Sequence, residues 1–204
     1  MRILVACEES QAVTIEMRKL GHEAYSCDIL GCSGGHPEWH LQQDVIPLLG
    51  DCWDMIIAFP PCTYLSNAGA RHLFPKGILD ENRFRKGLAA KDFFMRFYNA
   101  PCPRIAIENP TPSKIYELPP CNQIIQPFQF GHPFSKRTCL WLKGLPILFA
   151  TDIVPVLQST KEPGNWFNKG GKERQRNRAK TFPGVAKAMA AQWAGVSGNA
   201  NTRT

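Results

Sequence analysis

Residues 2–28 read RILVACEESQAVTIEMRKLGHEAYSCD and predict a strand, a helix and a second strand. The first five residues of this stretch form an apolar run of the kind found in buried parallel strands. We expect a helix over 11–20, with Ser10 as its cap and Gly21 after its end. The second strand, over 23–28, closes on an acidic residue. This order is the outline of one nucleotide-binding half of an α/β fold.

Apolar runs and helical patterns keep alternating along the rest of the chain. We expect strands over 53–59, 104–108, 123–126 and 138–142. Helices are expected over 81–98 and 184–193. Asn109-Pro110 should end the strand over 104–108. The apolar stripe predicted for the longer helix is Phe84, Leu88, Met95 and Tyr98. The segment 63–76, rich in Ser, Asn, Gly and Ala, predicts a mobile loop. The alternation predicts an α/β, Rossmann-like fold: a mostly parallel sheet with helices on both faces.

Length and composition limit the class of protein. The 204 residues, 44% of them hydrophobic and 20% charged, fit one compact domain with a proper core. We expect a single domain over 1–196 and a flexible tail over 197–204. No apolar run approaches the ~20 residues of a membrane-spanning helix. Residues 4–7 imitate a lipoprotein cleavage box but follow no signal-like stretch. The expected location is the cytoplasm, and the expected state is a monomer.

Eight cysteines raise the question of disulfides or a metal. Several of them lie in or beside apolar runs, which is typical of reduced, buried thiols. Cys27, Cys32, His36 and His40 follow one another at spacings that could offer metal ligands. The close Cys-x2-Cys pair of most structural zinc sites is missing, so we expect a Gly-rich loop here and no bound metal.

In an open parallel sheet, functional groups gather beyond the carboxyl ends of the strands. This chain places Glu8, Ser10, Asp28, Asp44, Cys62 and Glu108 at such positions. The two prolines before Cys62 restrict the backbone and leave the thiol at the strand end. A thiol and a carboxylate there could face each other across a cleft. The alternative is that Cys62 is a small buried hydrophobe and Glu108 a local cap.

Two motifs favour the first interpretation. Phe59-Pro60-Pro61-Cys62 and Ile107-Glu108-Asn109-Pro110 resemble, in order and separation, two central motifs of DNA (cytosine-5) methyltransferases. Phe130-Gly131-His132-Pro133, then Arg137, then Leu140-Trp141 resemble a later motif of that family. The resemblance extends over almost the whole chain and is nearest to short, prophage-type members that lack a large target-recognition domain.

The resemblance implies a fold, a reaction and a cofactor. It implies a Rossmann-like methyltransferase fold and transfer of a methyl group from S-adenosylmethionine to carbon 5 of cytosine in DNA. Cys62 would be the nucleophile, Glu108 would hold ring nitrogen 3, and Arg137 would support the flipped base. The cofactor contacts it implies are Glu8, Ser10, Asp28, Ile29, Asp44, Val45, Phe59 and Pro60.

The charge pattern predicts a nucleic-acid partner. Seven basic and two acidic residues lie within 161–180, which is +5 of the total net charge of +7. We expect the loop 158–180 to contact phosphates in place of a recognition domain, although a charge run can also be merely solvated. The contacts expected in this loop are Lys169, Lys172, Arg174, Arg176 and Arg178. Ser66, Arg71 and His72 are expected to contact the target strand, in single- or double-stranded DNA.

Two other functions stay open. The first loop lacks the family's Gly-rich turn, and Ser135 and Cys139 replace residues usual in the arginine motif. One alternative is therefore a related enzyme that modifies pyrimidines in RNA or nucleotides, or that transfers another group. The other is a catalytically silent nucleic-acid-binding homologue. The simultaneous presence of Cys62, Glu108 and Arg137 favours an enzyme.

Overall fold

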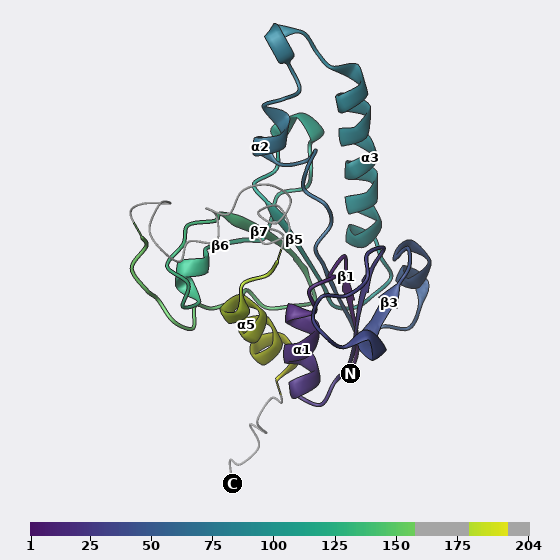
Figure 1. Ribbon diagram of the computed structural model, residues 1–204, viewed down its shortest axis with the longest axis vertical. Helices are drawn as coiled ribbons and strands as arrows, with labels where there is room; N and C mark the ends of the chain where they lie inside the picture. Colours follow the sequence, from purple (N-terminus) through teal and green to yellow (C-terminus); the bar gives the residue numbers. More distant parts are fainter. Residues whose placement is uncertain (158–179, 196–204) are drawn as a thin grey trace.

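The computed structural model describes residues 1–157 and 180–195, which form a seven-stranded sheet with helices on both faces (Figure 1). The strand order is β3-β2-β1-β4-β5-β7-β6. The strands are β1 (Arg2–Ala6), β2 (Glu23–Asp28), β3 (His40–Gln42), β4 (Met55–Ala58), β5 (Ile105–Pro110), β6 (Gln123–Ile125) and β7 (Thr138–Lys143). Strands β1 to β5 run parallel, whereas β7 pairs antiparallel with both β5 and β6. The Rossmann-like fold class predicted from the sequence is confirmed.

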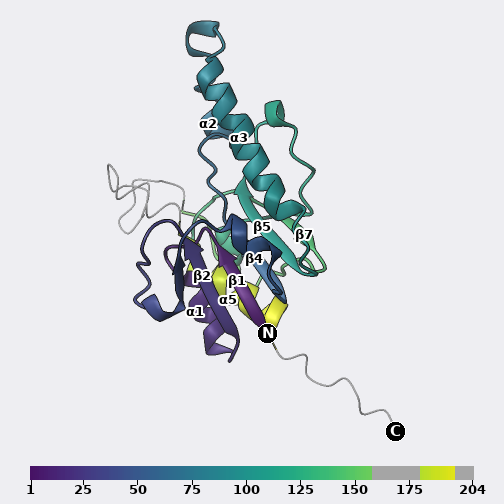
Figure 2. The same cartoon turned by 90° about the vertical axis from the view of Figure 1, so that its right-hand side faces the viewer.

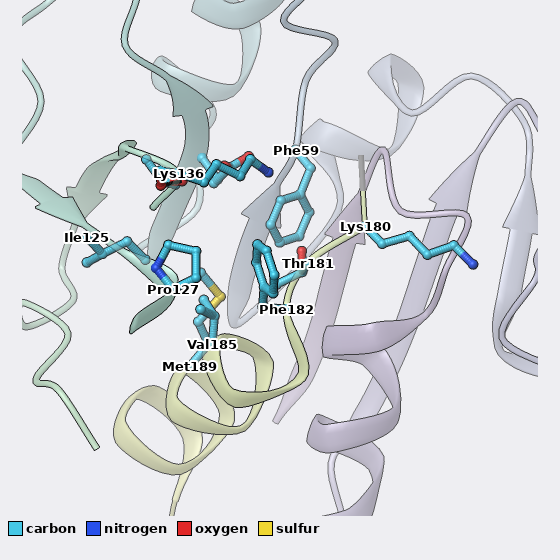
Figure 3. Close-up of a pocket in the computed structure, with 11 residues that line it drawn as sticks. Phe59, Ile125, Pro127, Lys136, Lys180, Thr181, Phe182, Val185 and Met189 are labelled. Atoms are coloured by element: carbon cyan, nitrogen blue, oxygen red, sulfur yellow. Dashed lines mark hydrogen bonds between the residues drawn. The ribbon is translucent and has the colours of Figure 1, made fainter. Parts of the chain in front are cut away.

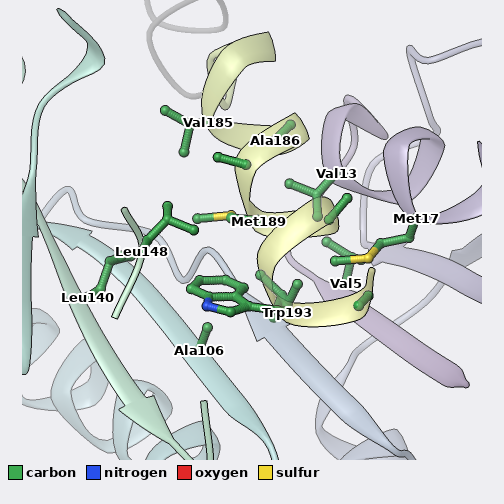
Figure 4. Packing of buried hydrophobic residues seen from close by; sticks show 14 of the residues in the cluster. Val5, Val13, Met17, Ala106, Leu140, Leu148, Val185, Ala186, Met189 and Trp193 are labelled. Carbon is green, nitrogen blue, oxygen red and sulfur yellow. The ribbon is translucent and has the colours of Figure 1, made fainter. Parts of the chain in front are cut away.

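The sheet is buried on both faces, because helices cover both of them. Successive side chains of each strand point to opposite faces. On one side, Val5, Ala106 and Leu140 pack against α1 (Ala12–Lys19) and α5 (Pro183–Ala194). Figure 4 shows Met189 and Trp193 of α5 on this face, with Val13 and Met17 of α1 beside them. On the other side, the neighbouring strand residues, such as Ile56, Ile107 and Trp141, pack against α3 (Glu81–Tyr98).

Helix α3 has the predicted bounds, but its buried face differs from the predicted stripe. Its buried residues are Gly87, Phe94 and Phe97. Leu88 and Tyr98 are 39% and 41% exposed. In both views of the ribbon α3 projects beyond the sheet with the short helix α2 (Asn67–Ala70) beside it (Figures 1 and 2). Two residues of the predicted stripe, one near the middle of α3 and one at its end, therefore remain partly exposed.

Strand β5 is longer than predicted. It continues through Asn109 and Pro110, which pair with Cys139 and Thr138 of β7. The proline lies in the last position of the strand, where the missing N–H costs little. The extension matters for the site, since it keeps Glu108 inside the sheet.

The segment predicted as a mobile loop, 63–76, contains local structure. It holds α2 and a short 3-10 helix, Pro75–Gly77. The Ser66 hydroxyl accepts a hydrogen bond from the Gly69 N–H at 3.2 Å and so caps α2. Gly69 is required here, because a side chain would collide with the Thr63 carbonyl oxygen, 2.0 Å from the position of its Cβ.

Two features predicted from the sequence fall outside the described residues: the loop 158–180, except its last residue Lys180, and the tail 197–204. No helix within residues 1–157 and 180–195 is long and apolar enough to cross a membrane.

Helix α1 is capped by Glu8 and not by Ser10 as predicted. The residue at the cap position is Gln11, in a left-handed conformation and without a side-chain cap of its own. The Glu8 carboxylate accepts hydrogen bonds from the Val13 N–H at 2.7 Å and from the Thr14 N–H and hydroxyl. A glutamate four residues before the helix is invisible to the usual capping pattern, because the left-handed turn at Cys7 brings it back over the helix end.

Burial raises the pKa of Glu8 to about 7, and the three hydrogen bonds only partly offset this effect. A carboxyl group with a raised pKa holds its proton longer in the folded state than in the unfolded state. Its contribution to stability is therefore intact below pH 4.5, its ordinary pKa, and is lost as the pH rises to about 7.

We predict that the free energy of unfolding of the wild type falls by roughly 3 kcal/mol between pH 4.5 and pH 7 from this group. Glu8→Gln cannot ionise and keeps an oxygen for the Val13 N–H, so this fall should disappear. Urea unfolding at several pH values measures it, with exposed Glu81→Gln as the control. Parallel pH profiles for wild type and Glu8→Gln would contradict the prediction.

Candidate active site

A small pocket, open to solvent, lies where the ends of β4 and β5 and the beginning of β7 meet the start of α5. Figure 3 shows the Phe59 and Phe182 rings and the Lys136 side chain around it, with Val185 and Met189 of α5 below. The lining residues are Phe59, Glu108, Ile125, Pro127, Lys136, Thr138, Lys180, Thr181, Phe182, Val185 and Met189. Most of the wall is apolar, and a few polar groups converge in it, as in typical ligand sites.

Glu108 is the carboxyl group of this pocket. It lies opposite Leu140 in the antiparallel pair of β5 and β7. Burial raises its pKa, while the charge of Lys136 and a hydrogen bond from Thr138 act in the opposite direction. A glutamic acid in this setting is suited to hold a proton at a pH where an exposed one would be ionised.

Lys136 and Lys180 line the pocket and Arg137 does not, so the structure does not place Arg137 where the sequence predicted it; of the two lysines, Lys136 acts on the pKa of Glu108. Lys136 and Thr138 line the pocket, whereas the side chain of Arg137 between them is exposed. Burial raises the pKa of the Cys139 thiol to about 11, and the charge of Arg137 lowers it slightly; Cys139 lies in the core on the opposite face of the sheet. Side chains alternate along a strand, so residues 136, 138 and 140 are expected on one face. This alternation is the sequence signal that would have placed Lys136 beside Thr138.

The loop that carries Cys62 runs along the end of β5. Backbone hydrogen bonds join Asn67 to Thr111 and Ser113 to Leu65, at 3.0 and 2.7 Å. A side-chain hydrogen bond of 3.2 Å joins Asn109 Nδ2 to the Pro60 carbonyl. The loop is also fixed from α3, because the Arg83 guanidinium donates to the Gly69 carbonyl at 3.0 Å. Two segments far apart in the sequence, one carrying Cys62 and the other Glu108, are thus held side by side.

Cys62 itself is partly buried and does not line the pocket. It lies two residues beyond Pro60, which is tied to the residue after Glu108. Of the predicted catalytic residues, the structure therefore places Glu108 in the pocket, Cys62 on the loop beside it, and Arg137 outside.

The residues predicted to bind the cofactor lie at the ends of β1, β2 and β3. The carboxylates of Asp28 and Asp44 both raise the pKa of the Cys7 thiol, together with the larger effect of burial, so they converge near the end of β1. Each also accepts a hydrogen bond from a backbone N–H two residues on, at 2.9 and 3.0 Å.

The other residues predicted to bind the cofactor differ in their exposure and contacts. Ile29 is 75% exposed, while Val45 is buried. Phe59 lines the pocket, whereas Ser10 does not and Glu8 is engaged with α1.

Three of the four residues that could offer metal ligands, Cys27, His36 and His40, have other partners. The two ring nitrogens of His40 contact Ser26 Oγ and the Leu30 carbonyl, both at 2.8 Å. The ring of His36 stacks on Trp39 with 3.9 Å between centroids. Nowhere in the described part of the chain do three or more His, Cys, Asp or Glu side chains gather as a metal ion would require.

The predicted nucleic-acid contacts divide into three groups. Ser66 is buried as the cap of α2. Arg71 and His72 are exposed just after α2 and bond to each other at 3.0 Å. The remaining contacts, Lys169, Lys172, Arg174, Arg176 and Arg178, lie outside the described residues.

No protein-family model and no curated protein matches the sequence. Among solved structures, the chain is similar to a protein assigned as a DNA modification methyltransferase encoded within a prophage (E. coli), with 13% identity and a TM-score of 0.45. It is also similar to a mutant of DNMT2 from Spodoptera frugiperda, with 17% identity and a TM-score of 0.40. These matches cover 83% and 77% of this chain, but only 55% of each of the other two. They describe a likeness of fold.

We predict that the pKa of Glu108 lies above the ordinary value and that Lys136→Met raises it further, because the ammonium group favours the ionised carboxylate. Arg137→Met, one residue away and facing elsewhere, is the matched control and should leave it unchanged. Carbon-13 NMR of the side-chain carboxyl group against pH measures both. A response to Arg137→Met but not to Lys136→Met would show that the arginine is the pocket cation.

Proposed function

We propose that this protein methylates carbon 5 of cytosine in DNA, through a transient bond between Cys62 and the base. The observation that carries the proposal is the juxtaposition of the two motifs: the loop bearing Cys62 is joined to the end of β5 at Asn109, the residue after Glu108, and Glu108 lines a pocket. A nucleophile and a proton-holding carboxyl group at one strand edge are the groups that this reaction needs.

Each group has a defined task in this proposal. Addition of the Cys62 sulfur to carbon 6 breaks the aromatic character of the ring and makes carbon 5 nucleophilic. Once carbon 5 has gained a methyl group, loss of its proton to a base would break the bond between sulfur and carbon 6 and restore the ring. The charge produced by the addition moves toward ring nitrogen 3, where protonated Glu108 can donate a hydrogen bond. Lys136 supplies positive charge in the same pocket, the task first expected of Arg137. The base must leave the double helix to enter, which costs a few kcal/mol when it starts paired.

The residues at the ends of β1 to β3 fit S-adenosylmethionine. Asp28 and Asp44 present carboxylates suited to hydroxyl and amino groups, and exposed Ile29 offers an apolar surface for a flat base. Cys7 occupies the first turn with a φ of 58°, a conformation usually left to glycine, so the backbone takes the left-handed turn without the Gly-rich sequence. When bound, this cofactor supplies an electrophilic methyl group.

DNA is the proposed substrate because a base-modifying pocket accompanies an excess of basic residues. Exposed Arg71 and His72 follow the Cys62 loop and can meet a strand entering the pocket. The segment between residues 145 and 180 is too short to form an extensive recognition surface, so we expect weak sequence selectivity.

We predict that wild-type protein with labelled S-adenosylmethionine forms 5-methylcytosine in DNA, detected by nucleoside mass spectrometry. It should also form a covalent adduct with an oligonucleotide containing 5-fluorocytosine, because fluorine blocks release of the base from sulfur. Cys62→Ser should abolish both, and Cys52→Ser, at an exposed cysteine outside the site, should abolish neither.

The same assay separates the alternatives. Product on RNA but not on DNA would indicate a related pyrimidine-modifying enzyme. Salt-dependent DNA binding without product or adduct from any substrate would indicate a silent binding protein and would refute the proposal.

A further inference from the structure

Asn109 contains an unusual polar atom. Its side chain is fully buried, and its Oδ1 is the one buried side-chain nitrogen or oxygen found without a hydrogen-bond partner among residues 1–157 and 180–195. Buried polar atoms are nearly always paired, so an unpaired one calls for a physical reason. A leucine would have almost the same size and would carry no polar atom of its own.

The other end of the same amide has a specific partner. Asn109 Nδ2 donates to the Pro60 carbonyl at 3.2 Å, across 49 positions of sequence. Pro60 and Pro61 lead directly to Cys62, and prolines transmit a fixed position better than other residues do because their φ angle is locked. The Nδ2 hydrogen bond therefore acts on the loop at the point where it begins.

The strand gives consecutive residues opposite directions. Glu108 faces the pocket, and Asn109 faces the side of the sheet that carries α3, because side chains alternate along β5. Two neighbouring residues thus serve two motifs: one supplies the carboxyl group and the other fastens the nucleophile's loop. Any shift of β5 moves both together.

We propose that Asn109 is a positioning residue, which fixes the Cys62 thiol relative to Glu108 through the Pro60 carbonyl. The Asn109 amide brings a donor to the Pro60 carbonyl at this place, and the unpaired Oδ1 belongs to the same amide. The role in catalysis rests on the proposed function, whereas the fixing of the loop does not.

Two variants test the proposal. Asn109→Leu keeps the volume and removes both the unpaired oxygen and the donor, so it exchanges one unpaired buried atom, Oδ1, for another, the Pro60 carbonyl. Asn109→Asp replaces the donor by a group that can donate to Pro60 only when it is protonated. The probes are labelling of Cys62 with 4,4′-dithiodipyridine, which reacts with thiols at acidic as well as neutral pH and is located by mass spectrometry, and adduct formation with the 5-fluorocytosine oligonucleotide. Cys52, on the surface and away from the loop, is the internal standard.

We expect Asn109→Leu to unfold at nearly the wild-type urea concentration. Its Cys62 labelling relative to Cys52 should rise severalfold as the loop loosens, and its adduct formation should slow by roughly a hundredfold, the usual cost of a small misplacement. In Asn109→Asp the labelling ratio should be raised at neutral pH and should return toward the wild-type ratio at acidic pH, where the carboxyl group can donate.

Unchanged labelling and unchanged adduct formation in Asn109→Leu would overturn the proposal. A loss of stability that accounts for both effects, with no pH-dependent return in Asn109→Asp, would reduce Asn109 to a structural residue and overturn it equally. If the wild type forms no adduct at all, the proposed function fails, but the labelling ratios still decide whether Asn109 holds the loop.

Discussion

The burial of the sheet on both faces is the constraint on which the rest of this structure depends. Strands β1, β4 and β5 are covered by α1 and α5 on one side and by α3 on the other, so nearly every one of their side chains must be apolar. Polar chemistry is then confined to the residues at and beyond the carboxyl ends. Such positions are occupied by Asp28, Asp44, Cys62 and Glu108. Glu8 is buried instead, so its carboxyl group serves as a helix cap and burial raises its pKa.

The antiparallel strand β7 turns this edge into a pocket. A seventh parallel strand would carry residues 136–138 to the far end of the sheet, whereas the reversed strand begins beside the end of β5. Lys136 and Thr138 therefore meet Glu108, and the start of α5 closes the space from below (Figure 3). The pKa of Glu108 results from this arrangement: burial by the pocket wall raises it, and the lysine limits the rise.

The loop between β4 and α3 is held by two buried leucines, Leu65 and Leu73, and by several hydrogen bonds to its backbone. Gly69 allows a tight turn against Thr63, Arg83 binds the Gly69 carbonyl, and Asn109 binds the Pro60 carbonyl. These contacts leave Arg71 and His72 exposed. They also explain why a segment with the composition of a mobile loop has a defined path.

The sequence alone determined six of the seven strands, the helices α1, α3 and α5 and the order of the motifs, because apolar periodicity and glycine or proline positions are local signals. Helix α3 and strands β1 and β2 have the predicted bounds. Tertiary structure decided which of Lys136 and Arg137 faces Glu108, since a one-residue change in the register of β7 against β5 would exchange them. It also decided that Glu8 caps α1 and that Asn109 reaches Pro60, because these contacts depend on backbone turns and on segments brought together only by the folded sheet.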